Sequence, residues 1–130
     1  MINLTLQMMI FTRNGLETEM LLFGRENLIK YNKAIRDKIP EIIAESGKKS
    51  NIKYLDDESF LAELEKKLSE EVNEYTESKD VEELADLLEV IYRISELRGV
   101  NSDELDKIRK EKAKERGKFD SNLFLIDAEK

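Results

Sequence analysis

Two pairs of carboxylates with the same three-residue spacing are the residues of this chain best suited to chemistry. Glu71 and Glu74 form the first pair, and Glu83 and Asp86 form the second. Residues three apart lie on one face of a helix. Both pairs belong to an acidic stretch, residues 56–89, which contains fourteen acidic residues and three lysines and so has a net charge of −11. The ordinary explanation of such a run is a solvated helix face, and the periodicity of the apolar residues tests it.

The first pair lies in or near the apolar face of a predicted helix. At about 100° per residue, Phe60, Leu64 and Leu68 mark an apolar arc. Glu71 falls inside this arc, and Glu74 falls about 40° outside its edge. An unpaired charge in the apolar interior is costly, so a carboxylate there needs a cationic partner or a metal ion. Glu71 is therefore not predicted to be an ordinary surface glutamate.

The second pair lies on the following predicted helix. Glu83 falls between Val90 and Ile94 within the apolar arc, and Asp86 falls at the border of that arc, beside Leu97. Apolar positions fill nearly all of the remaining circumference. This pattern predicts a helix that is packed on several sides.

A capping box is an alternative explanation for Glu83. In the sequence Asp80-Val81-Glu82-Glu83, the last side chain could reach back to the N–H of Asp80 and satisfy it. This alternative accounts for Glu83 alone, because neither Glu71 nor Asp86 stands at a capping position.

The two pairs are expected to converge. Consecutive helices joined by a turn as short as residues 78–80 pack antiparallel, which brings the four carboxylates together between them. The chain has no histidine and no cysteine, so imidazole bases, thiolate nucleophiles and ordinary zinc sites are excluded. Clustered oxygen ligands without nitrogen or sulfur suit Mg²⁺ or Mn²⁺.

Magnesium held by carboxylates usually engages phosphate groups, which predicts a polyphosphate substrate and hydrolysis by activated water. Glu71 and Glu74 are the candidates to accept the proton of that water. Two basic stretches, residues 33–38 and 107–118, are available to balance phosphate charge. A solvated charged surface is the alternative explanation for both stretches.

The elements that must position these groups are predicted to be helices, since the chain has only five glycines and one proline. Capping residues and periodicity predict four: near 39–46, from Asp56 or Asp57 to about Ser78, from a cap at Asp80 to Gly99, and from a cap at Ser102 to Arg116. The apolar tail Phe119–Ile126 is expected to pack back on these helices. The predicted fold is an all-α antiparallel helical bundle spanning residues 31–130.

Residues 1–30 are predicted to be an extension of this domain. Alternating apolar residues around Asn14-Gly15 predict a short β-hairpin, and a short helix is the competing interpretation. The extension would serve as an edge hairpin or as an oligomer contact, or it is an upstream extension, since Met8, Met9 and Met20 are candidate alternative starts.

Composition excludes several kinds of partner. A chain of 130 residues, 40% of them hydrophobic, is the size of one domain. Its net charge of −7 argues against a nucleic acid polymer as the partner. No apolar run reaches the roughly 20 residues that span a bilayer, so no membrane partner is expected. Without cysteines or a recognisable signal peptide, the chain is expected to be cytoplasmic.

Three motifs resemble one known family. They are the segment YNKAIRDKIPEII from Tyr31, the acidic motifs EEVNE from Glu70 and ELADLL from Glu83, and the closing segment KERGKF from Lys114. Together they resemble the MazG-type all-α nucleoside triphosphate pyrophosphohydrolases, in the branch of phosphoribosyl-ATP pyrophosphohydrolase-like and house-cleaning enzymes. The resemblance covers residues 28–126, and the first 27 residues have no counterpart. Only eight residues separate the two acidic motifs, which is shorter than the usual spacing in the family.

The resemblance implies a helical homodimer or homotetramer that hydrolyses a nucleoside triphosphate to the monophosphate and pyrophosphate. It implies that Mg²⁺ is bound by four acids and that phosphates are held by four basic residues. These acids are Glu71, Glu74, Glu83 and Asp86, and these basic residues are Lys33, Arg36, Lys114 and Arg116. Two alternatives stay open: hydrolysis of phosphoribosyl-ATP, and a non-catalytic acidic interaction module in which the buried acids pair with cations.

Overall fold

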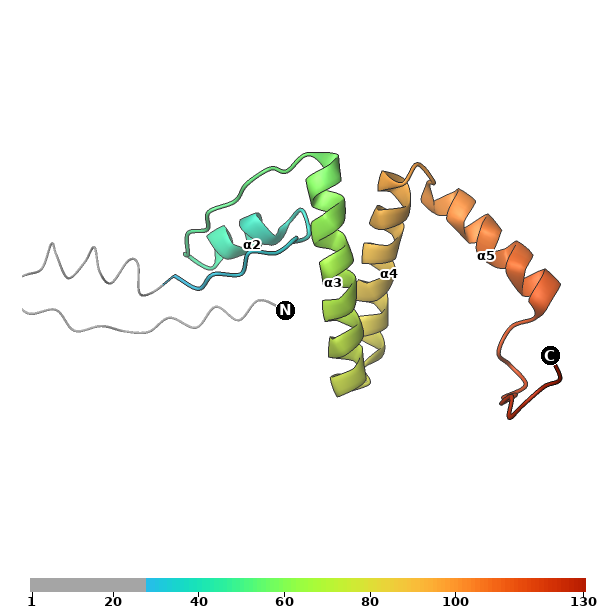
Figure 1. Ribbon diagram of the computed structural model, residues 1–130. Helices are drawn as coiled ribbons and strands as arrows, with labels where there is room; N and C mark the ends of the chain where they lie inside the picture. The colour runs from blue at the N-terminus through green and yellow to red at the C-terminus, as the bar shows by residue number, and fades with distance from the viewer. Residues whose placement is uncertain (1–27) are drawn as a thin grey trace, which may run out of the picture. The chain divides into compact units, whose positions relative to one another are not determined.

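The computed structural model describes residues 28–130, and this part of the chain is all-helical (Figure 1). Its helices are α2 (Ile39–Glu45), α3 (Asp57–Ser78), α4 (Val81–Leu97) and α5 (Ser102–Arg116). The chain divides into two units, Met1–Asn32 and Lys33–Lys130, and these helices all belong to the second. The predicted all-α class is confirmed for the described residues.

The hairpin predicted around Asn14-Gly15 lies outside the described residues. Within residues 28–130, no helix combines the length and the apolar character that crossing a membrane requires.

The helices α3 and α4 begin where the sequence predicts, because aspartate side chains cap both. The Asp56 carboxylate accepts a hydrogen bond from the Ser59 N–H at 2.8 Å. The Asp80 carboxylate accepts one from the Glu82 N–H at 3.1 Å. Each bond satisfies a backbone donor that the first turn of the helix leaves without an intrahelical partner.

The cap of α5 differs by one residue from the prediction. The capping side chain is that of Asn101, which accepts a hydrogen bond from the Glu104 N–H at 2.9 Å. Ser102, the predicted cap, is the first helical residue. Asparagine and serine are both good capping residues, so the residue types alone do not decide which of these two neighbours caps the helix.

A two-residue link turns the chain from α3 into α4. Lys79 ends α3 in the left-handed conformation with φ of 58°, and its N–H donates to the Tyr75 carbonyl at 2.8 Å. Asp80 then starts α4. The two helices run side by side in opposite directions, as predicted from so short a link (Figure 1).

The apolar core between these helices is small. It consists of buried Ala34, Leu64 and Val90, with four partly buried residues packed around them: Phe60, Leu68, Ile94 and Leu97. Leu64 belongs to α3 and Val90 to α4, whereas Ala34 belongs to the segment that precedes α2. The burial of Ala34 fixes this segment, residues 33–38, against the α3–α4 pair.

Two expectations of burial are wrong. Packing of α4 on several sides is not found, because Val90 is its one buried residue and Leu84 and Leu88 remain 41% and 45% exposed. Among the described helices, α3 covers α4 along its length, and α5 meets it near its carboxyl end. The tail Phe119–Ile126 does not pack back on the helices either, since its large apolar residues remain between 78% and 97% exposed.

Truncation of the core should be costly because the core is small. We expect Leu64→Ala to lower the free energy of unfolding by about 2–5 kcal/mol, since it removes a side chain that is 5% exposed at the α3–α4 contact. Urea denaturation followed by circular dichroism measures this change. Val81→Ala, at a position that is 74% exposed, is the control and should change the free energy by less than about 1 kcal/mol. Equal effects of the two substitutions would contradict this description of the core.

Candidate metal centre

Two adjacent helices supply the four predicted acids. Glu71 and Glu74 project from the second half of α3, and Glu83 and Asp86 project from the first turns of α4. Because the link between the helices is short, the end of α3 lies beside the start of α4. The Asp80 cap fixes where α4 begins and therefore which face carries its two acids.

The carboxylates converge as the sequence predicts. One carboxylate oxygen each of Glu71, Glu83 and Asp86 lies within 4.8 Å of the others, and the same holds for Glu70, Glu71 and Glu74. Glu71 belongs to both groups and joins them. We call these five residues the acidic cluster.

Glu71 is the buried centre of the acidic cluster. Its exposed fraction is 5%, and it is the one buried charged residue of the described chain. One carboxylate oxygen, Oε1, lies 3.5 Å from the Lys67 ammonium, one helical turn earlier. The other oxygen, Oε2, is buried without a hydrogen-bond partner. A buried acceptor that lacks a partner carries the full cost of its desolvation.

Glu83 does not form the predicted capping box. The Asp80 N–H donates instead to the Ser78 hydroxyl at 3.1 Å, so the backbone donor that Glu83 would have satisfied already has a partner. The Oε2 atom of Glu83 is also buried without a hydrogen-bond partner. The capping alternative is therefore wrong, and a second unpartnered oxygen belongs to the acidic cluster.

Crowding of these carboxylates changes their acidity. Burial, followed by the neighbouring charge of Glu74, raises the pKa of Glu71 above its ordinary value. Loss of solvation, followed by the interaction with the neighbouring Glu74 carboxylate, raises the pKa of Glu83. Both directions mean that the folded chain resists full ionisation of the acidic cluster.

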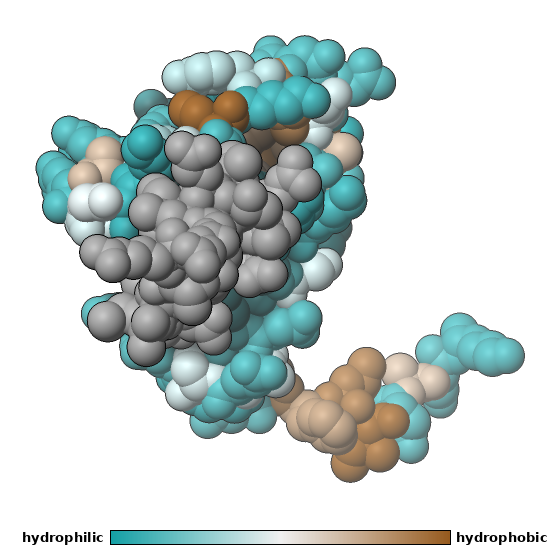
Figure 2. All heavy atoms as spheres, turned by 90° about the vertical axis from the view of Figure 1, so that its left-hand side faces the viewer, coloured by the Kyte–Doolittle hydropathy of each residue, from teal (hydrophilic) through white to brown (hydrophobic). Residues whose placement is uncertain are grey.

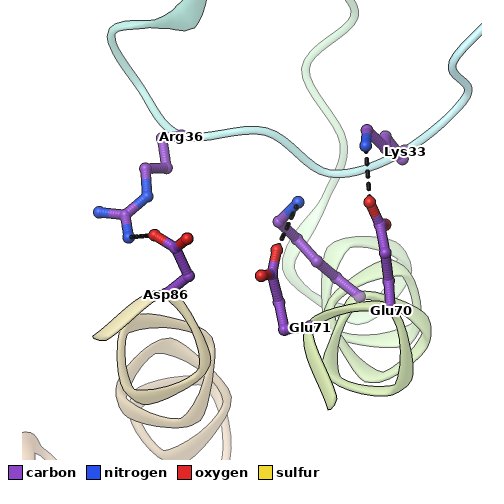
Figure 3. A network of polar contacts seen from close by, with 6 residues as sticks. Lys33, Arg36, Glu70, Glu71 and Asp86 are labelled. Carbon is purple, nitrogen blue, oxygen red and sulfur yellow. Dashed lines mark hydrogen bonds and ion pairs between the residues drawn. The ribbon is translucent and has the colours of Figure 1, made fainter. Parts of the chain in front are cut away.

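Three cations lie against the acidic cluster. Besides Lys67, the Lys33 ammonium lies 2.6 Å from a Glu70 oxygen, and the Arg36 guanidinium lies 2.6 Å from an Asp86 oxygen. In Figure 3 the 33–38 segment crosses the two helices, so that Lys33 meets α3 and Arg36 meets α4. The Lys33 contact lowers the pKa of Glu70.

The net charge of this site is negative and matches the charge of a divalent cation. With all groups ionised, five carboxylates and three basic side chains leave two negative charges, which is the charge that one Mg²⁺ ion neutralises. The donor set is entirely oxygen, and two of its oxygens are buried without partners. Both observations fit a hard divalent ion held between α3 and α4.

The predicted basic residues separate into two groups. Lys33 and Arg36 lie at the acidic cluster. Lys114 and Arg116 are exposed in the last turn of α5, whose helix contacts are with α4. The structure therefore brings the first two predicted phosphate ligands to the acids, whereas neither Lys114 nor Arg116 forms an ion pair or hydrogen bond with them.

The three ion pairs of the site were missed from the sequence, and two of them show why. The Lys67–Glu71 pair could have been found, because residues four apart on a helix are neighbours. The Lys33–Glu70 pair joins residues 37 positions apart, and no local pattern predicts it.

Comparisons with known proteins add nothing to this geometry: no family model, no curated protein and no solved structure matches the chain. The resemblance to MazG-type enzymes therefore stays a prediction from the three short motifs of the sequence.

The stability of the metal-free protein should fall as pH rises above about 4.5. The raised pKa values of Glu71 and Glu83 mean that the folded state holds their protons more tightly than the unfolded chain does, so their contribution to stability is present below the ordinary value of 4.5 and is lost above it. Groups with lowered pKa values, such as Glu70, change the stability only at pH values below their ordinary pKa, so they do not affect this window. Because the chain has no histidine, no imidazole titration obscures the window between pH 5 and 8.

Unfolding in urea and EDTA at several pH values from 4.5 to 8 measures this dependence. Glu71→Gln should raise the free energy of unfolding at neutral pH and flatten the pH dependence. Glu82→Gln, at an exposed neighbouring position, should preserve the wild-type profile. A Glu71→Gln variant that is less stable than the wild type at pH 8 would contradict the assignment of Glu71 as a buried charge that Lys67 compensates only in part.

Proposed function

We propose that this chain is a Mg²⁺-dependent nucleoside triphosphate pyrophosphohydrolase that removes unwanted nucleotides. The observation that carries the proposal is the pair of buried, unpartnered oxygens of Glu71 and Glu83 in a cluster of five carboxylates. A folded chain gains nothing from such oxygens alone, because each costs free energy. A divalent cation gives both of them a partner.

The proposed ligands of Mg²⁺ are Glu71, Glu74, Glu83 and Asp86, and Mn²⁺ is a chemically similar substitute. When bound, such an ion neutralises phosphate charge and lowers the pKa of a coordinated water. Glu70 pairs with Lys33 and would remain outside the ligand set.

The proposed reaction converts a nucleoside triphosphate and water into a nucleoside monophosphate and pyrophosphate. The water oxygen bonds to the α phosphorus. The bond between this phosphorus and the oxygen that bridges it to the β phosphorus breaks, and pyrophosphate leaves. A glutamate accepts the proton that the water loses. Glu71 and Glu74 are the candidates for this role, because both lie in the acidic cluster and the Glu74 carboxylate helps to raise the pKa of both Glu71 and Glu83.

Arg36 and Lys33 would hold the phosphates. A guanidinium binds a phosphate through two parallel hydrogen bonds, and an ammonium binds it as a point charge. Arg36 lies on Asp86 in this structure, so it must exchange that carboxylate for the substrate when Asp86 binds the metal. Lys114 and Arg116 are proposed as further phosphate ligands from the resemblance alone.

A non-catalytic acidic interaction module is the second candidate function, and two contacts favour it. In such a module the acids pair with internal cations, as Asp86 does with Arg36 and Glu71 does with Lys67. These contacts leave the second oxygen of Glu71 and the Oε2 atom of Glu83 without partners, so the module explains the acidic cluster less completely.

Purified protein should release pyrophosphate from at least one member of a panel of ribo- and deoxyribonucleoside triphosphates in Mg²⁺, and EDTA should stop the release. Glu83→Gln should lower the rate by roughly 100-fold, because it replaces an ionised metal ligand with a neutral amide. Mg²⁺ at 100 times its dissociation constant should stabilise the wild type by about 2.7 kcal/mol and the variant much less. Glu82→Gln, one residue away and exposed, is the matched control and should behave as the wild type.

Two results would separate the alternatives. Hydrolysis of phosphoribosyl-ATP without hydrolysis of ordinary triphosphates would assign the same chemistry to a different substrate. No pyrophosphate from any substrate, together with unchanged stability in Mg²⁺, would contradict the enzyme and support the interaction module.

Replacement of Arg36 tests the proposed exchange at Asp86. Arg36→Ala should leave the free energy of unfolding within about 1 kcal/mol of the wild type, because the ion pair is exposed. It should tighten Mg²⁺ binding by up to about 5-fold, since it removes a competing cation, and raise the KM for the triphosphate by about 10-fold or more. Calorimetry and steady-state kinetics measure the two effects.

Lys38→Ala is the matched control, because Lys38 is an exposed cation of the same segment. It should change neither quantity appreciably. Weaker Mg²⁺ binding in Arg36→Ala, with an unchanged KM, would show that Arg36 supports the acids rather than exchanging between them and the substrate.

A further inference from the structure

The acidic cluster contains two groups of three carboxylates that share one member. Glu70, Glu71 and Glu74 form the group on α3, and Glu71, Glu83 and Asp86 form the group between α3 and α4. A carboxylate has two oxygens, so one glutamate can bind two neighbouring ions, one through each oxygen. Two-ion sites of this kind hold their ions about 3.5–4 Å apart. The number of ions that the acidic cluster binds therefore depends on how the two oxygens of Glu71 are used.

The two oxygens of Glu71 have different surroundings. Its Oε1 atom lies 3.5 Å from the Lys67 ammonium, whereas its Oε2 atom is buried without a hydrogen-bond partner. The other unpartnered oxygen of the acidic cluster belongs to Glu83. Figure 3 shows Glu71 between Asp86 on one side and Glu70 on the other. Both unpartnered oxygens therefore belong to members of the group between α3 and α4.

Lys67 is itself largely buried. Its side chain is 15% exposed and lies one turn before Glu71 on α3, so the helix backbone fixes the ammonium next to this carboxylate. Its charge also reaches Glu70, because the hydrogen bond from Lys33 and, after it, the charge of Lys67 both lower the pKa of that residue. Lys67 thus supplies the group on α3 with positive charge that a second metal ion would otherwise supply.

We infer that Lys67 takes the place of a second divalent ion on Glu71, so that the acidic cluster binds one ion, at the group that contains Glu83 and Asp86. The inference rests on the metal site of the proposed function and extends it, because it assigns a role to Lys67 and sets the number of ions. Lys67 is a positioning residue: it holds the Oε1 atom of Glu71 and leaves the Oε2 atom for the metal.

Charge and distance both oppose a second ion while Lys67 is present. The acidic cluster and its three cations carry two negative charges when fully ionised, and a second divalent ion would turn this charge into two positive charges. Mg²⁺ binds oxygen at about 2.0–2.1 Å, so an ion on the Oε1 atom of Glu71 would lie no more than about 6 Å from the Lys67 ammonium. Two cations so close together in a site with little water repel each other strongly.

Replacement of Lys67 by methionine, which is uncharged and of similar length, tests the inference. Isothermal titration calorimetry measures the number of Mn²⁺ ions bound per chain, and electron paramagnetic resonance detects bound ions that lie close together. We expect the wild type to bind one Mn²⁺ ion with the spectrum of an isolated ion. Lys67→Met should bind two, and its spectrum should show the coupling of two ions bridged by Glu71.

Two further variants are matched controls. Lys67→Arg keeps the positive charge and should bind one ion, as the wild type does. Lys66→Met removes the neighbouring lysine, which is 74% exposed and lies 3.0 Å from Glu63, and should also bind one ion. Circular dichroism in the presence of Mn²⁺ checks that each variant keeps its helices.

The possible results separate this inference from the proposed function. A wild type that binds two coupled ions would overturn the inference, whether or not Lys67→Met folds, and so would a folded Lys67→Met variant that binds one ion. Neither result contradicts the proposed enzyme, because the metal site is present in both. One ion in the wild type and two in Lys67→Met, without pyrophosphate release from any triphosphate, would support the inference and contradict the proposed function. No bound Mn²⁺ in any of these proteins would contradict both.

Discussion

The convergence of carboxylates between two antiparallel helices is the constraint on which the rest of this structure depends. A link of only Lys79 and Asp80 brings the end of α3 against the start of α4, and both carry acids on the facing side. Burial of Glu71 costs stability, and Lys67 compensates only one of its two oxygens. The 33–38 segment, fixed by the burial of Ala34, brings two further cations to the edge of the cluster. These contacts leave two negative charges in a group of carboxylates that could hold a metal ion.

Local physics explains which features the sequence predicts well. The helix boundaries follow from capping side chains within three residues of the backbone groups that they satisfy, as at Asp56 and Asp80. The burial of Glu71 follows from helical periodicity, because its position inside the apolar arc depends only on the turn angle. The convergence of the four acids follows from the length of one link.

The remaining features depend on contacts that no local pattern encodes. The ion pair of Arg36 with Asp86 joins residues 50 positions apart. The rejection of the capping box at Glu83 depends on the Ser78 hydroxyl, which competes for the Asp80 N–H. The exposure of α4 and of the tail also escaped prediction, because apolar periodicity indicates that a face is to be buried and does not identify the molecule that covers it.

The contacts within the described chain leave two features unsatisfied. The acidic cluster keeps carboxylate oxygens without partners, and the tail keeps large apolar side chains exposed (Figure 2). The metal site is the central claim, and its most direct test is the anomalous scattering of a crystal soaked in Mn²⁺. We predict an anomalous peak between α3 and α4, about 2.0–2.3 Å from oxygens of Glu71, Glu83 and Asp86, with Arg36 displaced from Asp86. No peak at this position, with Arg36 still bound to Asp86 at saturating Mn²⁺, would contradict the account.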